Sequence, residues 1–93
     1  MNDGSLYGND VRSYAISTFE ELRATFWPTE LTKEIEGAGC RVWDDNRRLE
    51  TWVHLGPLTY KADGRIDGTP SAIRALLHEH VILLRNKIEG ALY

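Results

Sequence analysis

The fold is decided by residues 69–92, which read TPSAIRALLHEHVILLRNKIEGAL and carry the clearest helical pattern in the chain. Thr69 suits the N-cap position, and Pro70 suits the first helical position, where its missing N–H costs nothing. Gly90 suits a stop at the other end. One narrow face of this helix carries the side chains expected in the core: Ile73, Leu77, His80, Leu84, Ile88 and Ala91. The pattern predicts a long C-terminal helix that buries one side.

A second apolar group lies on the side of this helix that should be polar. Ile82 points almost opposite to the core face, beside Ala75, and Leu83 lies on the flank. A small domain has little material with which to bury both sides of a helix. We therefore expect Ala75, Ile82 and Leu83 to contact the N-terminal segment or a second copy of the chain, as in a homodimer. The alternative is a stray exposed aliphatic side chain, which is common.

Two histidines on the same helix form the spacing His78-x-His80. Residues two apart on a helix point in directions that differ by about 200°, so the two rings diverge. His80 belongs to the core face and His78 to the solvent face. We therefore expect one buried, hydrogen-bonded histidine and one surface histidine, and no metal site.

The first half of the chain is predicted to be mainly helical. Residues 1–10 are expected to be a flexible lead, and residues 11–17 a short edge strand. Thr18 and Glu21 form a capping box, which predicts a helix starting at Thr18. Pro28 breaks or kinks this helix and favours an extended backbone at Trp27. A second helical piece is expected over residues 30–36, ended by the glycines of residues 37–39.

Residues 40–68 show an alternation of period two, which is typical of β-strands. Strands are expected over residues 40–43, 49–55 and 58–62, joined by turns at 44–47 and at Gly56-Pro57. Asp63-Gly64 is a strong hairpin signal and predicts a short fourth strand over residues 65–67.

The strand register can be predicted from the same alternation. Pairing Val42 with Leu49 and Leu55 with Leu58 gives the sheet one apolar face, formed by Val42, Leu49, Thr51, Val53, Leu55, Leu58 and Tyr60. The other face then carries Arg41, Trp43, Arg48, Glu50, Trp52, His54, Thr59 and Lys61. We predict one α+β domain over residues 11–93: a three- to four-stranded antiparallel meander packed on one face by a Pro-kinked N-terminal helix and a long C-terminal helix.

The order helix, three strands, helix is similar to that of double-stranded-RNA-binding domains. Those domains place a lysine-rich cluster at the start of the last helix, where this chain reads TPSAIR. Because that charge is absent, the similarity of topology implies no RNA-binding function.

Composition bounds the kind of protein. The chain has 93 residues and a net charge of −3, which gives no electrostatic reason to expect nucleic acid as the main partner. The single Cys40 excludes an internal disulfide and the usual four-ligand zinc frameworks. No secretion signal or membrane-spanning run is present. We expect a cytoplasmic protein with no cofactor, no metal and no membrane partner.

The polar face of the predicted sheet is the strongest candidate for a binding site. Tryptophan and arginine often anchor protein interfaces, and aromatic rings among cations also suit stacked bases of single strands. The candidate residues are Arg41, Trp43, Arg48, Trp52, His54 and Lys61. The alternative is that the N-terminal segment covers both tryptophans, or that basic side chains pack over them.

The sequence does not place the residues of a catalytic site close together. Cys40 alternates onto the apolar sheet face, where a thiol is inert, and His54 lacks a nucleophile and an orienting group that the sequence places beside it. The sequence therefore predicts a small non-enzymatic protein-interaction module, such as a regulator, adaptor or inhibitor, that forms a homodimer. The second hypothesis is a single-stranded nucleic-acid-binding module that uses the tryptophan face.

Overall fold

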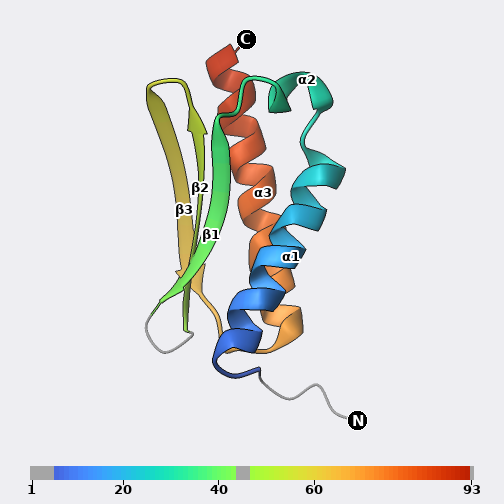
Figure 1. The fold of residues 1–93 in the computed structure, drawn as a ribbon, viewed down its shortest axis with the longest axis vertical. Helices are drawn as coiled ribbons and strands as arrows, with labels where there is room; N and C mark the ends of the chain where they lie inside the picture. The colour runs from blue at the N-terminus through green and yellow to red at the C-terminus, as the bar shows by residue number, and fades with distance from the viewer. Residues whose placement is uncertain (1–5, 44–46, 93) are drawn as a thin grey trace.

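The computed structural model describes residues 6–43 and 47–92. The elements are α1 (Asn9–Phe26), α2 (Thr29–Thr32), β1 (Gly37–Trp43), β2 (Arg48–Leu55), β3 (Leu58–Arg65) and α3 (Pro70–Leu92). The strands form an antiparallel meander in the order β1-β2-β3. Both long helices lie on one side of this sheet, with α1 against β1 and α3 against β2 and β3 (Figure 1). The predicted α+β class is confirmed.

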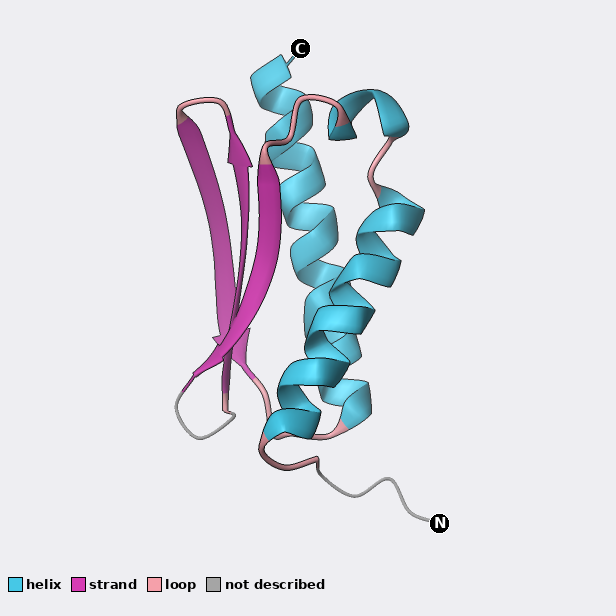
Figure 2. Cartoon of the chain, viewed as in Figure 1, coloured by secondary structure: helices cyan, strands magenta, loops and turns pink. Residues whose placement is uncertain are grey.

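The predicted register is also confirmed. Val42 pairs with Leu49, and Leu55 pairs with Leu58. The β2 side chains that face the helices are all buried, namely Leu49, Thr51, Val53 and Leu55. Figure 2 shows the resulting two layers, helices on one side and strands on the other. The core lies between these layers.

The predicted edge strand over residues 11–17 is wrong, because these residues belong to α1. Val11, Ala15, Phe19 and Leu22 are buried at helical spacing, so the period is that of a helix and not of a strand. Thr18 does not cap this helix but is buried in its middle. The capping-box pattern therefore occurs inside a helix that starts two turns earlier.

The predicted lead over residues 1–10 is shorter than expected, because Asn9 and Asp10 belong to α1. Leu6 packs against the core, and its backbone N–H donates to the carbonyl of Gly68 at 2.8 Å. The first five residues of the predicted lead lie outside the described residues. The short described segment before α1 lies at the end of the helix layer where α1 begins (Figure 1).

The break at Pro28 is confirmed, and Trp27 is extended with φ −94° and ψ 121°. The helix that follows spans only Thr29–Thr32 instead of residues 30–36. Its predicted stop, residues 37–39, is the start of β1. These residues pair with Val53 and its neighbours on β2, and the ladder hydrogen bonds outweigh the turn preference of the two glycines. Most of the predicted turn over residues 44–47 lies outside the described residues.

The predicted hairpin at Asp63-Gly64 is wrong, since β3 continues straight to Arg65. Gly64 pairs with Leu49, and a Cβ added to Gly64 would lie 2.9 Å from Cδ1 of Leu76. This glycine therefore allows α3 to approach the sheet closely instead of forming a turn. No fourth strand is present in the part of the chain that the structure describes.

The start of α3 is confirmed, since the N–H of Ala72 donates to Oγ1 of Thr69 at 3.3 Å. The predicted core positions from Ile73 to Ile88 are buried, but Ala91 is exposed in the last turn. Gly90 does not end the helix, which continues to Leu92.

Candidate functional site

One face of the sheet carries no helix in the described part of the chain. The register places ten side chains there, which we call the outer face: Arg41, Trp43, Arg48, Glu50, Trp52, His54, Thr59, Lys61, Asp63 and Arg65. All eight polar-face residues predicted from the alternation are among them. Four of the ten side chains are basic and two are acidic, whereas the whole chain carries a net charge of −3. The outer face is therefore the relatively basic side of an acidic protein.

The two tryptophans of the outer face are held differently. Trp52 lies across Gly39 of β1: a Cβ added to Gly39 would come within 2.7 Å of its Cζ2 atom. Trp43 is 40% exposed, and the guanidinium carbon of Arg41 lies 4.5 Å from its ring centroid. Neither ring belongs to the core between the layers. The cation–π contact with Arg41 stabilises the Trp43 ring in its exposed position.

Both tryptophans line a single depression at the open edge of β1, which we call the edge groove. Its other lining residues are Arg12 and Ile16 of α1 together with Cys40, Arg41 and Val42 of β1, and its volume is about 560 Å³. Ile16 is 41% exposed. The sequence analysis missed Arg12 and Ile16, because it assigned residues 11–17 to a strand. A test of helical periodicity from Asn9 onward would have placed both on a helix, next to the buried Val11 and Ala15.

The remaining candidate residues make local contacts on the outer face. Arg48 forms an ion pair with Asp63, and the hydrogen bond from this guanidinium holds the pKa of Asp63 below its usual range. Nδ1 of His54 lies 2.9 Å from Oγ1 of Thr59. Lys61 is exposed. None of these contacts covers the edge groove.

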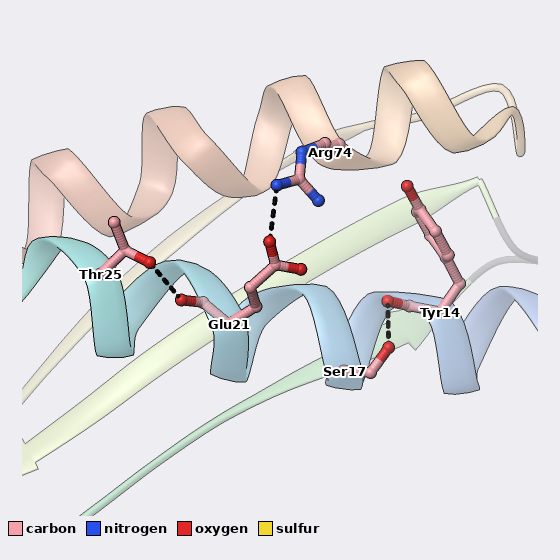
Figure 3. Close-up of polar contacts among 5 residues, drawn as sticks. All are labelled: Tyr14, Ser17, Glu21, Thr25 and Arg74. Carbon is pink, nitrogen blue, oxygen red and sulfur yellow. Dashed lines mark hydrogen bonds and ion pairs between the residues drawn. The ribbon is translucent and has the colours of Figure 1, made fainter.

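The predicted self-association residues lie on α3, in the helix layer. Ala75 is exposed, Ile82 is half-buried and Leu83 is 43% exposed. Ala75 lines a groove of about 620 Å³ between α1 and α3, together with Leu22, Phe26 and His78. An ion pair between Glu21 and Arg74 joins the two helices beside this groove at 2.9 Å (Figure 3). Its hydrogen bond lowers the pKa of Glu21.

Burial disfavours the charged forms of two titratable side chains, Cys40 and His80. Burial raises the pKa of the Cys40 thiol to about 11, with the nearby charge of Glu20 adding to the shift, so the thiolate is suppressed. His80 is 2% exposed, and its Nδ1 lies 3.0 Å from Oγ1 of Thr51. Burial also lowers the pKa of His80.

The other histidine of the pair, His78, is exposed and packs edge-to-face on Phe26 at 5.0 Å between ring centroids. The prediction of one buried and one surface histidine is confirmed. Within residues 6–43 and 47–92, no three potential metal ligands of the His, Cys, Asp and Glu types lie close together.

Comparison with protein-family models, curated proteins and solved structures finds no match for this chain. In the part that the structure describes, no helix combines the length and the apolar character needed to cross a membrane.

Proposed function

We propose that this chain is a small non-enzymatic protein-interaction module that acts in the cytoplasm as a regulator, adaptor or inhibitor. Its partner binds the edge groove and the part of the outer face formed by β1 and β2, so that Lys61 and Arg65 of β3 lie outside the proposed contact area. The observation that carries the proposal is the placement of Trp43 and Trp52 around one open groove, outside the core that α1 and α3 complete. Large aromatic side chains that a fold does not bury are the usual anchors of protein interfaces.

The charge pattern of the outer face supports a protein partner over a nucleic acid. Arg48 is already engaged by Asp63, and Glu50 lies directly opposite Arg41 in the β1–β2 register. A phosphate backbone requires cations that are free to replace its counterions, and acidic neighbours oppose it. Alternating charges instead suit a polypeptide surface of mixed charge.

The second candidate is a module for single-stranded nucleic acid. It is favoured by the two tryptophan rings and by the excess of basic over acidic side chains on the outer face. Bases stack on such rings, and the resulting affinity falls steeply with salt.

We also propose that the chain forms a homodimer through α3. Ala75, Ile82 and Leu83 are apolar side chains of α3 outside its buried stripe, and Ala75 lines the groove between α1 and α3. This arrangement leaves the outer face free for a different partner. A dimer would bury Leu83, whose exposure is otherwise unfavourable.

The test is capture of the partner by the tagged chain from a lysate of the source cells, followed by mass measurement of the complex. We expect Trp43→Ala and Trp52→Ala to lose the partner. The matched control Leu83→Ser should keep the partner and lower the copy number. Retention of the partner by both tryptophan variants contradicts the proposal, and so does salt-dependent capture of single strands alone.

A further inference from the structure

The alternation of hydrogen-bonded and non-hydrogen-bonded residue pairs in the sheet identifies which backbone groups face the open edge of β1. The N–H of Ile66 donates to the carbonyl of Arg47 at 2.7 Å, which extends the β2–β3 register by one pair. Hydrogen-bonded pairs alternate in an antiparallel ladder, so odd-numbered residues of β2 bond to β3 and even-numbered residues bond to β1. Their β1 partners are the odd-numbered residues Gly37 to Trp43. Ala38, Cys40 and Val42 therefore direct their N–H and C=O groups away from the sheet.

The two edge strands differ in their protection against a further strand. Proteins commonly block an edge with charged side chains, proline or a bulge. The outer face of β3 presents Lys61, Asp63 and Arg65 in succession, all exposed. In β1 the single charged residue is Arg41, and the strand reads GAGCRVW with no proline. Within residues 6–43 and 47–92, the β1 edge is thus the less protected of the two.

The edge groove has walls that suit an extended chain beside β1. Ile16 stands on the α1 side, and the ring of Trp52 stands on the outer side, where it lies across Gly39. A strand placed there would direct alternate side chains toward these two walls. Among the described residues that line the groove, both charged ones are arginines, Arg12 and Arg41.

From this edge we infer the class of the partner, an inference that rests on the proposed function. We propose that the edge groove binds an extended acidic segment of the partner protein, which adds to β1 as a further strand. Its apolar side chains face Ile16, and its carboxylates face Arg41. The open N–H and C=O groups of Ala38, Cys40 and Val42 supply the ladder hydrogen bonds.

The same backbone groups and charges favour an acidic peptide segment over a nucleic acid and over a second copy of the chain. A nucleic acid backbone offers phosphate acceptors but no regular donors for the three β1 carbonyls. The β1 strand of a second copy would bring its own Arg41 into a groove already lined by Arg12 and Arg41, and like charges at this range repel. An acidic polypeptide satisfies the ladder and is attracted by the two arginines that line the groove.

The probes are two peptides with blocked ends, each as long as the seven-residue β1 strand, one alternating Val and Glu and the other alternating Val and Lys. We expect the acidic peptide to bind at least about tenfold more tightly than the basic one at low salt, with amide shifts in NMR spectra at Ala38, Cys40 and Val42. Equal affinities, or shifts confined to β3, would overturn the proposal.

Proline on each edge gives a matched pair of variants. Cys40→Pro removes an outward N–H and leaves the β1–β2 ladder intact, so it should abolish peptide binding. Lys61→Pro makes the same change on the edge of β3 and should leave binding unchanged. Circular dichroism checks that each variant is folded. Binding by a folded Cys40→Pro variant would contradict strand addition.

Charge reversal keeps the inference testable if Cys40→Pro does not fold. Arg41→Glu should reverse the preference, so that the basic peptide binds better, and Arg65→Glu on β3 should not. A preference that survives Arg41→Glu would overturn the proposal, as would occupation of the groove by a single-stranded oligonucleotide or a second copy. If both peptides fail while lysate capture still depends on Trp43, strand addition is wrong and the proposed function stands.

Discussion

The two sides of the sheet hold their tryptophans differently, and the chain has three of them. Trp27, on the helix side, is 4% exposed, packs edge-to-face on Phe19, and donates its indole N–H to the carbonyl of Val81 at 3.0 Å. Trp43 and Trp52, on the open side, lie against Arg41 and Gly39 at the rim of a groove. The chain thus completes one side by itself and leaves large apolar rings at the surface of the other.

This difference implies that the buried tryptophan matters most for folding stability, whereas the two tryptophans at the groove matter most for binding. A ring that is hydrogen-bonded and buried contributes to folding, whereas a ring at a rim contributes when a partner covers it. The predictions below test this contrast between the two sides, beginning with the largest effect.

Trp27→Ala should lower the free energy of unfolding by about 3–5 kcal/mol, because it empties a large buried volume and removes the bond to Val81. Urea denaturation followed by circular dichroism measures this loss. A loss below about 1 kcal/mol would show that the helix side is not closed by Trp27.

Two threonine–histidine pairs, one on each side of the sheet, provide the second contrast. Thr51→Val leaves Nδ1 of the buried His80 without its partner and should cost about 1–3 kcal/mol. Thr59→Val breaks the similar contact to His54 on the outer face and should cost less than about 0.5 kcal/mol, because water replaces the bond there. Equal losses in denaturant titrations would remove the distinction.

The buried histidine also gives the helix side a dependence on pH. Burial lowers the pKa of His80 from its usual 6.5, so the unfolded chain binds the proton more readily than the folded chain. The free energy of unfolding is therefore highest at pH values clearly above 6.5, and it falls as the pH drops below 6.5. His80→Gln should flatten this fall. Denaturation midpoints between about pH 7.5 and 5 measure the change.

The glycines beneath the outer face supply the next contrast. Gly39→Ala places a Cβ 2.7 Å from the Trp52 ring and forces the ring to move, at a cost of about 1 kcal/mol. Gly37→Ala meets His54 at an ordinary 3.7 Å and should be neutral or slightly stabilising. A red shift of tryptophan emission in Gly39→Ala but not in Gly37→Ala checks that the ring was displaced.

Trp43→Ala should have the smallest effect on folding, within about 0.5 kcal/mol, because the ring is outside the core. The same variant should lose the partner in the capture experiment. A large loss of stability would instead mean that Trp43 is a structural residue like Trp27.

Much of the sheet could be predicted because alternation is a local signal that fixes a face. Pairing Val42 with Leu49 and Leu55 with Leu58 placed every outer-face candidate correctly, from Arg41 to Lys61. Two local signals misled. Thr18 and Glu21 match a capping box, but tertiary burial of Val11 and Ala15 extends α1 through it. Asp63-Gly64 matches a hairpin, but Gly64 serves the close approach of Leu76.

The edge groove could not be predicted, because its walls come from elements that are distant in the sequence. Arg12 and Ile16 reach it from α1, and Trp52 reaches it from β2 across a glycine of β1. Alternation assigns a face to each side chain but does not show that a bare glycine lets a neighbouring ring lie over the edge strand. That contact depends on the three-dimensional packing of the two strands.

The most direct test of the open side as the binding side is amide hydrogen exchange of the chain in complex with its captured partner. We predict slower exchange at Ala38, Cys40 and Val42 on the β1 edge, and unchanged exchange at Lys61 on β3. Protection that appears only along the exposed side of α3, around Ala75, with β1 unchanged, would contradict the account.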